Sequence, residues 1–227
     1  MLMKHADHDR IAAAVAEAEG KTSGEILCVL QHHVSEYREV PLAWAAAAAL
    51  VIPALLAAFG LAPWLNSSDG GDWIASNAVS LSTALNTAIM GYALTQLVIF
   101  VVVAAALAII RPLKLAVTPG SLKRLRVKRA ALHHLKAAHL LSDEGIVVIF
   151  ASDQERMVTV VADEALHLKA GDAAWDGAVA AVLSGIKAGD PTSGFVAAVE
   201  LCGGYLSEHF PLTGPRRNGL ADGILEI

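Results

Sequence analysis

Residues 145–164 read GIVVIFASDQERMVTVVADE, and this stretch decides the fold of the chain. Its first part, up to residue 151, is apolar throughout, which is typical of a buried strand. Residues 157–162 are rich in β-branched side chains and predict a second strand. Because only residues 152–156 separate the two, the sequence predicts an antiparallel hairpin.

Helices and one more strand are expected around this hairpin. Residues 25–34, EILCVLQHHV, have the composition of a strand, and residues 124–141 show an amphipathic helical pattern. The other helices are expected at residues 8–19, 173–188 and 191–210. A strand, a helix and a strand in series give a right-handed parallel crossover. The sequence therefore predicts an α/β fold with a small mixed β-sheet flanked by helices.

Two long uncharged segments interrupt this pattern. Apolar residues make up 55% of the chain and charged residues 17%, whereas soluble domains carry about 25% charged residues. Residues 42–65 and 89–110 contain no charged side chain, and each exceeds the roughly 20 residues that a helix needs to cross a bilayer. They are predicted to be transmembrane helices joined by the loop 66–88. The two helices and the loop together form a hairpin inserted into the α/β domain.

The distribution of Lys and Arg predicts how this hairpin is oriented. Residues 41–110 contain neither, whereas residues 111–129 contain several of both. The positive-inside rule then places both termini in the cytoplasm and the loop 66–88 outside it. Residues 1–41 and 111–227 are expected to form one discontinuous cytoplasmic domain.

Composition and motifs argue against several functions. The formal net charge of −5 gives no indication of nucleic-acid binding. The two cysteines, Cys28 and Cys202, show no metal or redox spacing and are interpreted as buried apolar residues in a reducing compartment. Phosphate-binding loops and a G-x-S-x-G nucleophile turn do not occur in the sequence.

Acidic residues gather where the parallel strands are expected to begin, which we call the N-terminal edge of the sheet. Glu25 starts one strand there, and the metal candidates surround the other two strands. These candidates are Asp143, Glu144, Asp163 and Glu164. Carboxylates that converge at one edge could bind calcium or magnesium, which prefer oxygen ligands. The alternative is that they are hydrophilic turn residues exposed to water.

A second group lies where the parallel strands end, which we call the C-terminal edge. Ligands usually bind at this edge of open α/β sheets. The candidates are His33, Asp153, Glu155 and Arg156, with His32 and Ser152 nearby. His33 near Asp153 could form an acid–base pair, or the histidines could merely cap a strand. The first strand runs within a few residues into the membrane segment, so this edge is expected to face the bilayer. A strand of about 20 Å separates the two edges, so the two groups cannot form one site.

A basic cluster follows the second membrane segment. Its members are Lys123, Arg124, Arg126, Lys128 and Arg129. Juxtamembrane cations are attracted to anionic lipid headgroups by about 1 kcal/mol each. The cluster is expected to bind the membrane surface, or to act only as a topology signal.

Three segments give the chain a resemblance to the TPM domain family. They are AEAEGKTSGEILCVL at residues 16–30, RVKRAALHHLKAAHLLSDEGIVVIFASDQERMVTVVAD at residues 126–163, and the later Trp175. The resemblance covers about 155 residues in two pieces, and the order and spacing of its motifs carry it, since no single motif is specific. It implies an α/β sandwich. The family includes bacterial membrane proteins, so the resemblance also implies a bacterial inner-membrane protein.

Two functions follow from these observations. The first is a noncatalytic module that binds a partner membrane protein during membrane-protein assembly or quality control. The second is a calcium-dependent acid phosphatase that uses the carboxylate cluster, because the TPM family includes a plant member with acid phosphatase activity and calcium at an acidic site. The sequence leaves open whether the protein is an enzyme.

Overall fold

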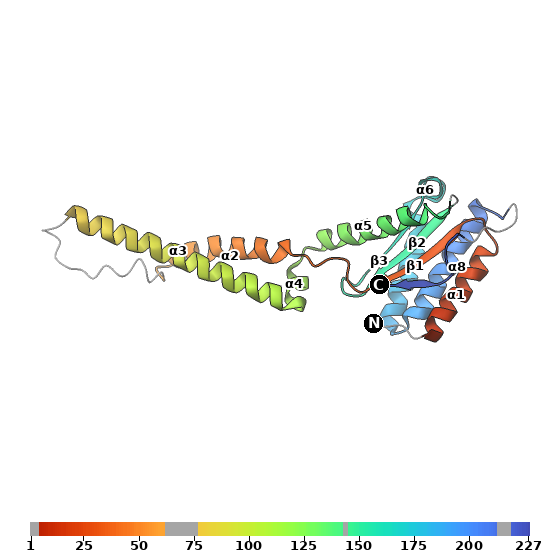
Figure 1. The fold of residues 1–227 in the computed structure, drawn as a ribbon, viewed down its shortest axis with the longest axis horizontal. Helices are drawn as coiled ribbons and strands as arrows, with labels where there is room; N and C mark the ends of the chain where they lie inside the picture. The colour runs from red at the N-terminus through yellow and green to blue at the C-terminus, as the bar shows by residue number, and fades with distance from the viewer. Residues whose placement is uncertain (1–4, 62–76, 143–144, 213–218) are drawn as a thin grey trace. The chain divides into compact units, whose positions relative to one another are not determined.

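The computed structural model describes residues 5–61, 77–142, 145–212 and 219–227, which form two compact units (Figure 1). One unit, Met1–Glu36 with Pro119–Ile227, is an α/β domain assembled from both ends of the chain. The other, Tyr37–Thr118, is helical and interrupts the first. We call them the α/β unit and the hairpin unit.

The α/β unit is built on a mixed sheet whose strands lie in the order β3-β2-β1-β4. The strands are β1 (Glu25–Gln31), β2 (Ile146–Ser152), β3 (Met157–Ala162) and β4 (Ile224–Glu226). β1 pairs with β2 in parallel, and β2 pairs with β3 in an antiparallel hairpin that aligns Ser152 with Met157. The predicted hairpin, the parallel pairing of the two strands and the α/β class are therefore confirmed.

Two strand features differ from the sequence prediction. β1 ends at Gln31, three residues before the predicted end, so His32 and His33 follow the strand. β4 was not predicted, and it adds to β1 in parallel at the other side of the sheet. Its three residues are too few to show an alternating pattern, so only the backbone pairing reveals it.

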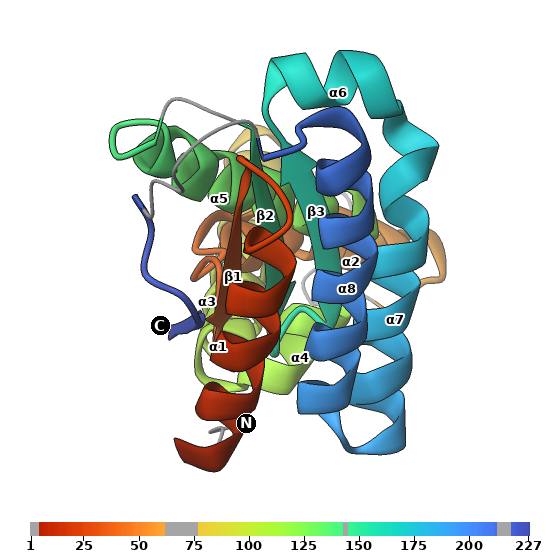
Figure 2. The ribbon, with the colours of Figure 1, turned by 90° about the vertical axis from the view of Figure 1, so that its right-hand side faces the viewer.

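Helices cover both faces of the sheet (Figure 2). α5 (Gly120–Ala138) packs on one face through apolar residues at helical spacing. The opposite face is covered by α1 (His5–Glu19), α7 (Asp176–Ala188) and α8 (Pro191–His209). Neighbouring residues of β1 therefore enter different cores, with Cys28 facing α1 and α8 and Val29 facing α5.

The helix boundaries follow local sequence signals. The carboxylate of Asp190 accepts a hydrogen bond from the Ser193 backbone N–H at 3.1 Å, so the predicted N-cap of α8 is confirmed. α7 ends at Gly189, whose φ of 80° is the left-handed conformation that terminates helices. The short helix α6 (Glu164–Ala170) was not predicted. The helix predicted from residue 173 begins as the 3-10 turn η1 (Asp172–Trp175), and α7 follows it from Asp176.

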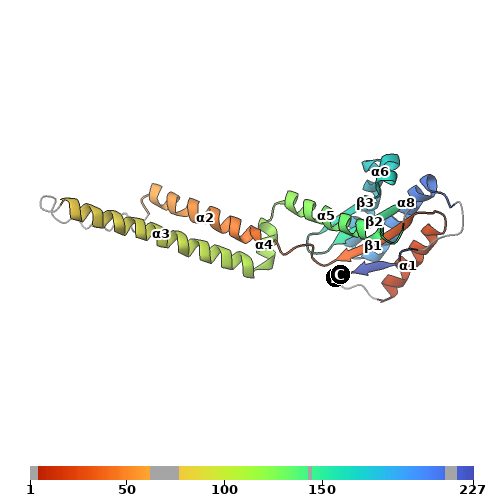
Figure 3. The ribbon, with the colours of Figure 1, turned by 45° about the horizontal axis from the view of Figure 1, so that its top comes forward.

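The hairpin unit consists of α2 (Glu39–Ala58), α3 (Asn77–Ile109) and the short α4 (Arg111–Val117). α2 and α3 lie side by side along most of α2 (Figures 1 and 3). Two segments, Glu39–Ala58 and Leu85–Ile109, are long and apolar enough to span a membrane. The indole of Trp44 donates a hydrogen bond to the Val117 carbonyl at 3.1 Å.

The bounds of these two helices differ from the prediction. α2 ends at Ala58 rather than at residue 65, because Gly60 (φ 67°) and Leu61 close a Schellman cap on the carbonyls of Ala57 and Leu56. α3 begins at Asn77, so residues 77–88 of the predicted loop are helical. Polar Ser, Asn and Thr lower the hydropathy there without breaking a helix, which a hydropathy pattern does not detect. Residues 62–76 lie outside the described part of the chain.

The two cysteines, one on β1 and one on α8, are free and fully buried in the same core, as predicted. Burial raises the pKa of the Cys202 thiol to about 12. Burial also raises the pKa of Cys28, and the nearby Cys202 and Glu19 raise it further. Since the thiolate is the reactive form, both thiols are expected to resist alkylation near neutral pH in the folded protein.

Alkylation followed by mass spectrometry tests this expectation. The folded chain should remain unmodified while urea makes both cysteines react. Rapid modification without denaturant would contradict the burial of this core. The same reaction then reports on unfolding of the α/β unit in variants of the full chain.

Candidate functional site

Asp163 lies at the N-terminal edge, where it links β3 to α6. It is 7% exposed and serves as the N-cap of α6. Its Oδ1 accepts a hydrogen bond from the Leu166 N–H at 2.8 Å, and its Oδ2 accepts one from the Ile146 N–H at 3.3 Å. Both carboxylate oxygens therefore bind backbone amides, which is a structural role that the acidic pattern alone did not reveal.

Glu25 lies at the same edge, because β1 pairs it with Ile146. The side chain is 3% exposed, and its Oε1 accepts a hydrogen bond from the Gly219 N–H at 2.7 Å. Its Oε2 is buried and has no hydrogen-bond partner among the described residues. A buried carboxylate oxygen without a partner is stabilised by a nearby cation.

The remaining metal candidates do not complete a site in the structure. Asp143 and Glu144 lie outside the described residues, and Glu164 is exposed on the first turn of α6. Across residues 5–61, 77–142, 145–212 and 219–227, no group of three or more His, Cys, Asp or Glu side chains is arranged to hold a metal ion.

Glu155 is the central residue of the C-terminal edge. It is buried within the turn between β2 and β3, where its Oε1 accepts a hydrogen bond from the Val34 N–H at 3.3 Å and its Oε2 accepts one from the Ser152 hydroxyl. The turn is also joined to the segment after β1, since the Asp153 N–H donates to the Gln31 carbonyl at 3.1 Å. Glu155 thus holds this turn against the residues that follow β1.

The histidine that faces Asp153 is His32 and not His33, which corrects the predicted pair. The His32 Nδ1 lies 3.7 Å from the Asp153 Oδ2, whereas His33 is exposed. Because β1 ends at Gln31, the alternation of a strand no longer determines where the two histidines point. The structure adds His8 and Glu226, which the sequence prediction missed. The Glu226 carboxylate lies 3.3 Å from His8 Nε2 and 3.7 Å from His32 Nε2.

A cavity of about 280 Å³ opens at this edge between the sheet, α7 and the start of α8. Its walls are mostly apolar, and Asp153, Arg156 and Lys187 are the charged residues that line it. Arg156 has φ 51°, a left-handed conformation that is uncommon for residues other than glycine and asparagine. Of the predicted candidates, Asp153 and Arg156 line the cavity, whereas Glu155 does not.

Exposed leucines characterise the N-terminal edge. Leu140 and Leu141 follow α5, in the connection to β2, and are 86% and 67% exposed. Leu168 lies on α6, the helix after β3, and is 78% exposed. Leu212 follows α8, near the point where Thr22 pairs with Pro211, and is 40% exposed. Chain topology therefore brings four exposed apolar side chains to one edge of the sheet.

The predicted basic cluster lies on α5 and is only partly exposed. Arg124, Lys128 and Arg129 are exposed, while Lys123 and Arg126 are half-buried. The Arg126 guanidinium donates a hydrogen bond to the Ser35 hydroxyl. Arg124 and Lys128 are four residues apart, so they lie on one face of the helix.

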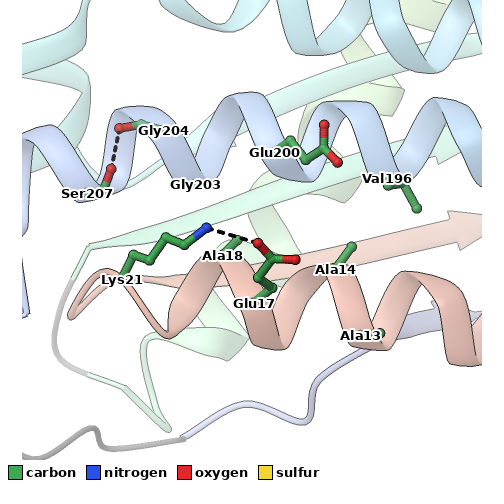
Figure 4. A pocket seen from close by; sticks show the side chains of 10 residues that line it. All are labelled: Ala13, Ala14, Glu17, Ala18, Lys21, Val196, Glu200, Gly203, Gly204 and Ser207. Carbon is green, nitrogen blue, oxygen red and sulfur yellow. Dashed lines mark hydrogen bonds and ion pairs between the residues drawn. The ribbon is translucent and has the colours of Figure 1, made fainter.

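A groove of about 350 Å³ runs between α1 and α8 (Figure 4). Lys21 pairs with Glu17 at 3.0 Å on its rim, and small residues line much of it. Gly203 brings the helices together, because a Cβ built there would lie 2.7 Å from the Ala18 Cβ. A Cβ at the adjacent Gly204 would meet only open space, so the two glycines form a matched pair.

Alanine at these two positions is expected to have opposite effects. Gly203→Ala should destabilise the α/β unit by about 1–3 kcal/mol, the usual range for an overpacked core. Gly204→Ala should be neutral or stabilise it by up to about 1 kcal/mol, because alanine favours a helix over glycine. Urea-dependent labelling of the buried cysteines measures both, and equal stability of the two variants would contradict the close approach of α1 and α8.

The described elements form an α/β sandwich. Among solved structures, the NMR structure of BA42 protein from the psychrophilic bacterium Bizionia argentinensis shares this fold with a TM-score of 0.52. The match covers 100% of this chain and 96% of that chain at 15% sequence identity, so it establishes the fold alone. No family model matches the chain, and no curated protein matches it.

Proposed function

We propose that this chain is a membrane-anchored, TPM-like module that binds a partner membrane protein without catalysing a reaction, in membrane-protein assembly or quality control. The observation that carries the proposal is the set of exposed leucines at the N-terminal edge. Leu140 and Leu168 are 86% and 78% exposed although they flank strands of the central sheet. Apolar side chains concentrated at one edge are a common feature of protein-binding surfaces.

The hairpin unit supports the membrane anchor. Its two apolar helices expose most of their large side chains, including Leu50, Leu94 and Val98. The absence of Lys and Arg from residues 41–110 and their abundance after residue 110 favour cytoplasmic termini in a bacterial inner membrane. The exposed cations on α5 would add attraction to anionic headgroups of the same membrane surface.

Cysteine accessibility tests the orientation. Because Cys28 and Cys202 are buried, an introduced cysteine can be labelled over a low background. In intact cells, a membrane-impermeant maleimide should label Ser67→Cys and should label Ser184→Cys only after lysis. Ser184 is exposed on α7 and is the matched control. Labelling of Ser184→Cys in intact cells would overturn the cytoplasmic placement of the α/β unit.

Cross-linking in native membranes tests partner binding. The full chain should form a reproducible adduct with a membrane protein. Leu140→Asp combined with Leu168→Asp should reduce that adduct at least about tenfold, as expected when a charge enters an apolar interface. Leu201→Asp is the control, since Leu201 is exposed on α8 outside this edge. Recovery of the chain alone, or equal adducts from both variants, would contradict the proposal.

A second candidate function is a calcium-dependent acid phosphatase at the N-terminal edge. The unpartnered Oε2 of Glu25 favours it, because a buried carboxylate oxygen can serve as a calcium ligand. Asp143, Glu144 and Glu164 would be the other acidic ligands, whereas Asp163 already holds two backbone amides. When bound, calcium would supply positive charge to balance a phosphoester.

Calcium titration of the full chain tests this second function. If it is correct, the chain binds calcium, hydrolyses a generic phosphoester, and loses both properties in Glu25→Gln while the buried cysteines stay protected. Glutamine keeps an acceptor for the Gly219 N–H and removes the free anionic oxygen. Unchanged hydrolysis in this variant, or no calcium binding by the wild type, would exclude the site.

A further inference from the structure

We infer that the cavity at the C-terminal edge binds a small amphipathic carboxylate. The inference does not depend on the partner-binding function, because it concerns the opposite edge of the sheet. The cavity is enclosed by the end of β1, the turn after β2, the end of α7 and the start of α8. The ends of parallel strands are where α/β sheets usually bind small ligands.

The walls of the cavity select an apolar body. The buried Leu30 and Phe195 line it together with Leu183, Ile186 and Pro191. Its volume of about 280 Å³ is at the lower limit of small-molecule sites, and an engineered cavity of about 150 Å³ holds one benzene molecule. The body of the ligand is therefore no larger than about two benzene rings.

Two cations at the rim select an anionic head. The side chains of Arg156 and Lys187 are exposed, line the cavity and form no ion pair or hydrogen bond among the described residues. The nearby carboxylates are already engaged, since Asp153 lies 3.7 Å from His32 and Asp190 caps Ser193. Guanidinium groups match the planar carboxylate with paired hydrogen bonds. A doubly charged phosphate would be harder to desolvate beside these apolar walls.

The backbone conformation of Arg156 supports a ligand-binding role for its side chain. Its φ of 51° is a conformation in which glycine or asparagine would be less strained. Strained residues persist where function requires them, and they cluster at ligand sites. An arginine in this turn therefore costs conformational free energy, and in return its side chain lines an apolar cavity.

Methyl NMR of the full chain in phosphatidylcholine nanodiscs tests the inference with 4-phenylbutanoate as the probe. The methyl groups of Leu30, Leu183 and Ile186 should shift on titration, while those of Ile11 and Leu135, in the cores, should not. The neutral analogue 4-phenylbutanamide should bind at least about tenfold more weakly. It lacks the negative charge, and the loss of one hydrogen bond between charged groups weakens binding by about that factor.

Two variants separate binding from folding. Lys187→Ala and Arg156→Gly should each weaken binding about tenfold, and Arg156→Gly should leave the fold intact because glycine favours positive φ. Lys169→Ala, which removes a lysine on α6, is the matched control and should bind as the wild type does. Equal binding of the carboxylate and the amide, or wild-type binding by both variants, would overturn the inference. Unchanged methyl signals of Leu30, Leu183 and Ile186 on addition of the probe would also overturn it.

Discussion

Replacing Asp163 by alanine is expected to lower the free energy of unfolding of the α/β unit by about 2–4 kcal/mol, because two hydrogen bonds to a charged acceptor and an N-cap are lost together. The N–H groups of Ile146 and Leu166 would lose their acceptor at a buried site. Asp163→Asn should cause a smaller loss, since its oxygen can still cap α6 while its amide nitrogen cannot accept from Ile146. Urea-dependent alkylation of Cys28 and Cys202 measures the change.

The neighbouring carboxylate provides the control for this prediction. Glu164 is exposed, so Glu164→Gln should change the stability by less than about 0.5 kcal/mol. The measurement is made in the presence of a chelator, because a structural role for Asp163 requires no calcium. A loss of stability that appears only when calcium is present would show that Asp163 acts as a metal ligand.

Replacing Glu155 by alanine is expected to destabilise the same unit by about 2–3 kcal/mol, since a buried carboxylate that accepts two hydrogen bonds is removed. The effect should be local as well as global. The amide of Val34 donates to Glu155 and should exchange its hydrogen faster in the variant, because the link between the turn and the segment after β1 is lost.

Gln154 is the matched control in the same turn. Its side chain is exposed, so Gln154→Ala should leave both the stability and the exchange of Val34 within error of the wild type. Unchanged exchange of Val34 in Glu155→Ala would contradict the structural role assigned to this carboxylate.

For the acidic residues, the sequence predicted the edge of the sheet at which each one lies but not its role. It assigned Glu25 and Asp163 to one edge and Asp153 and Glu155 to the other, and the strand pairing confirms both assignments. It did not distinguish carboxylates that hold the fold from those available to a ligand. That distinction depends on which backbone N–H groups point at each side chain, and those amides come from residues distant in the sequence, as with Val34 and Glu155.

The sequence by itself determined the α/β class, the hairpin from β2 to β3 and the two apolar helices. These features depend on local periodicity, turn length and uninterrupted hydropathy, all of which are visible in a window of a few residues. Only the tertiary structure decided that His32 rather than His33 faces Asp153, that Glu226 joins them, and that Arg156 and Lys187 share a cavity. Each of these pairs joins residues from separate elements, and the packing of α7, α8 and β4 on the sheet brings them together.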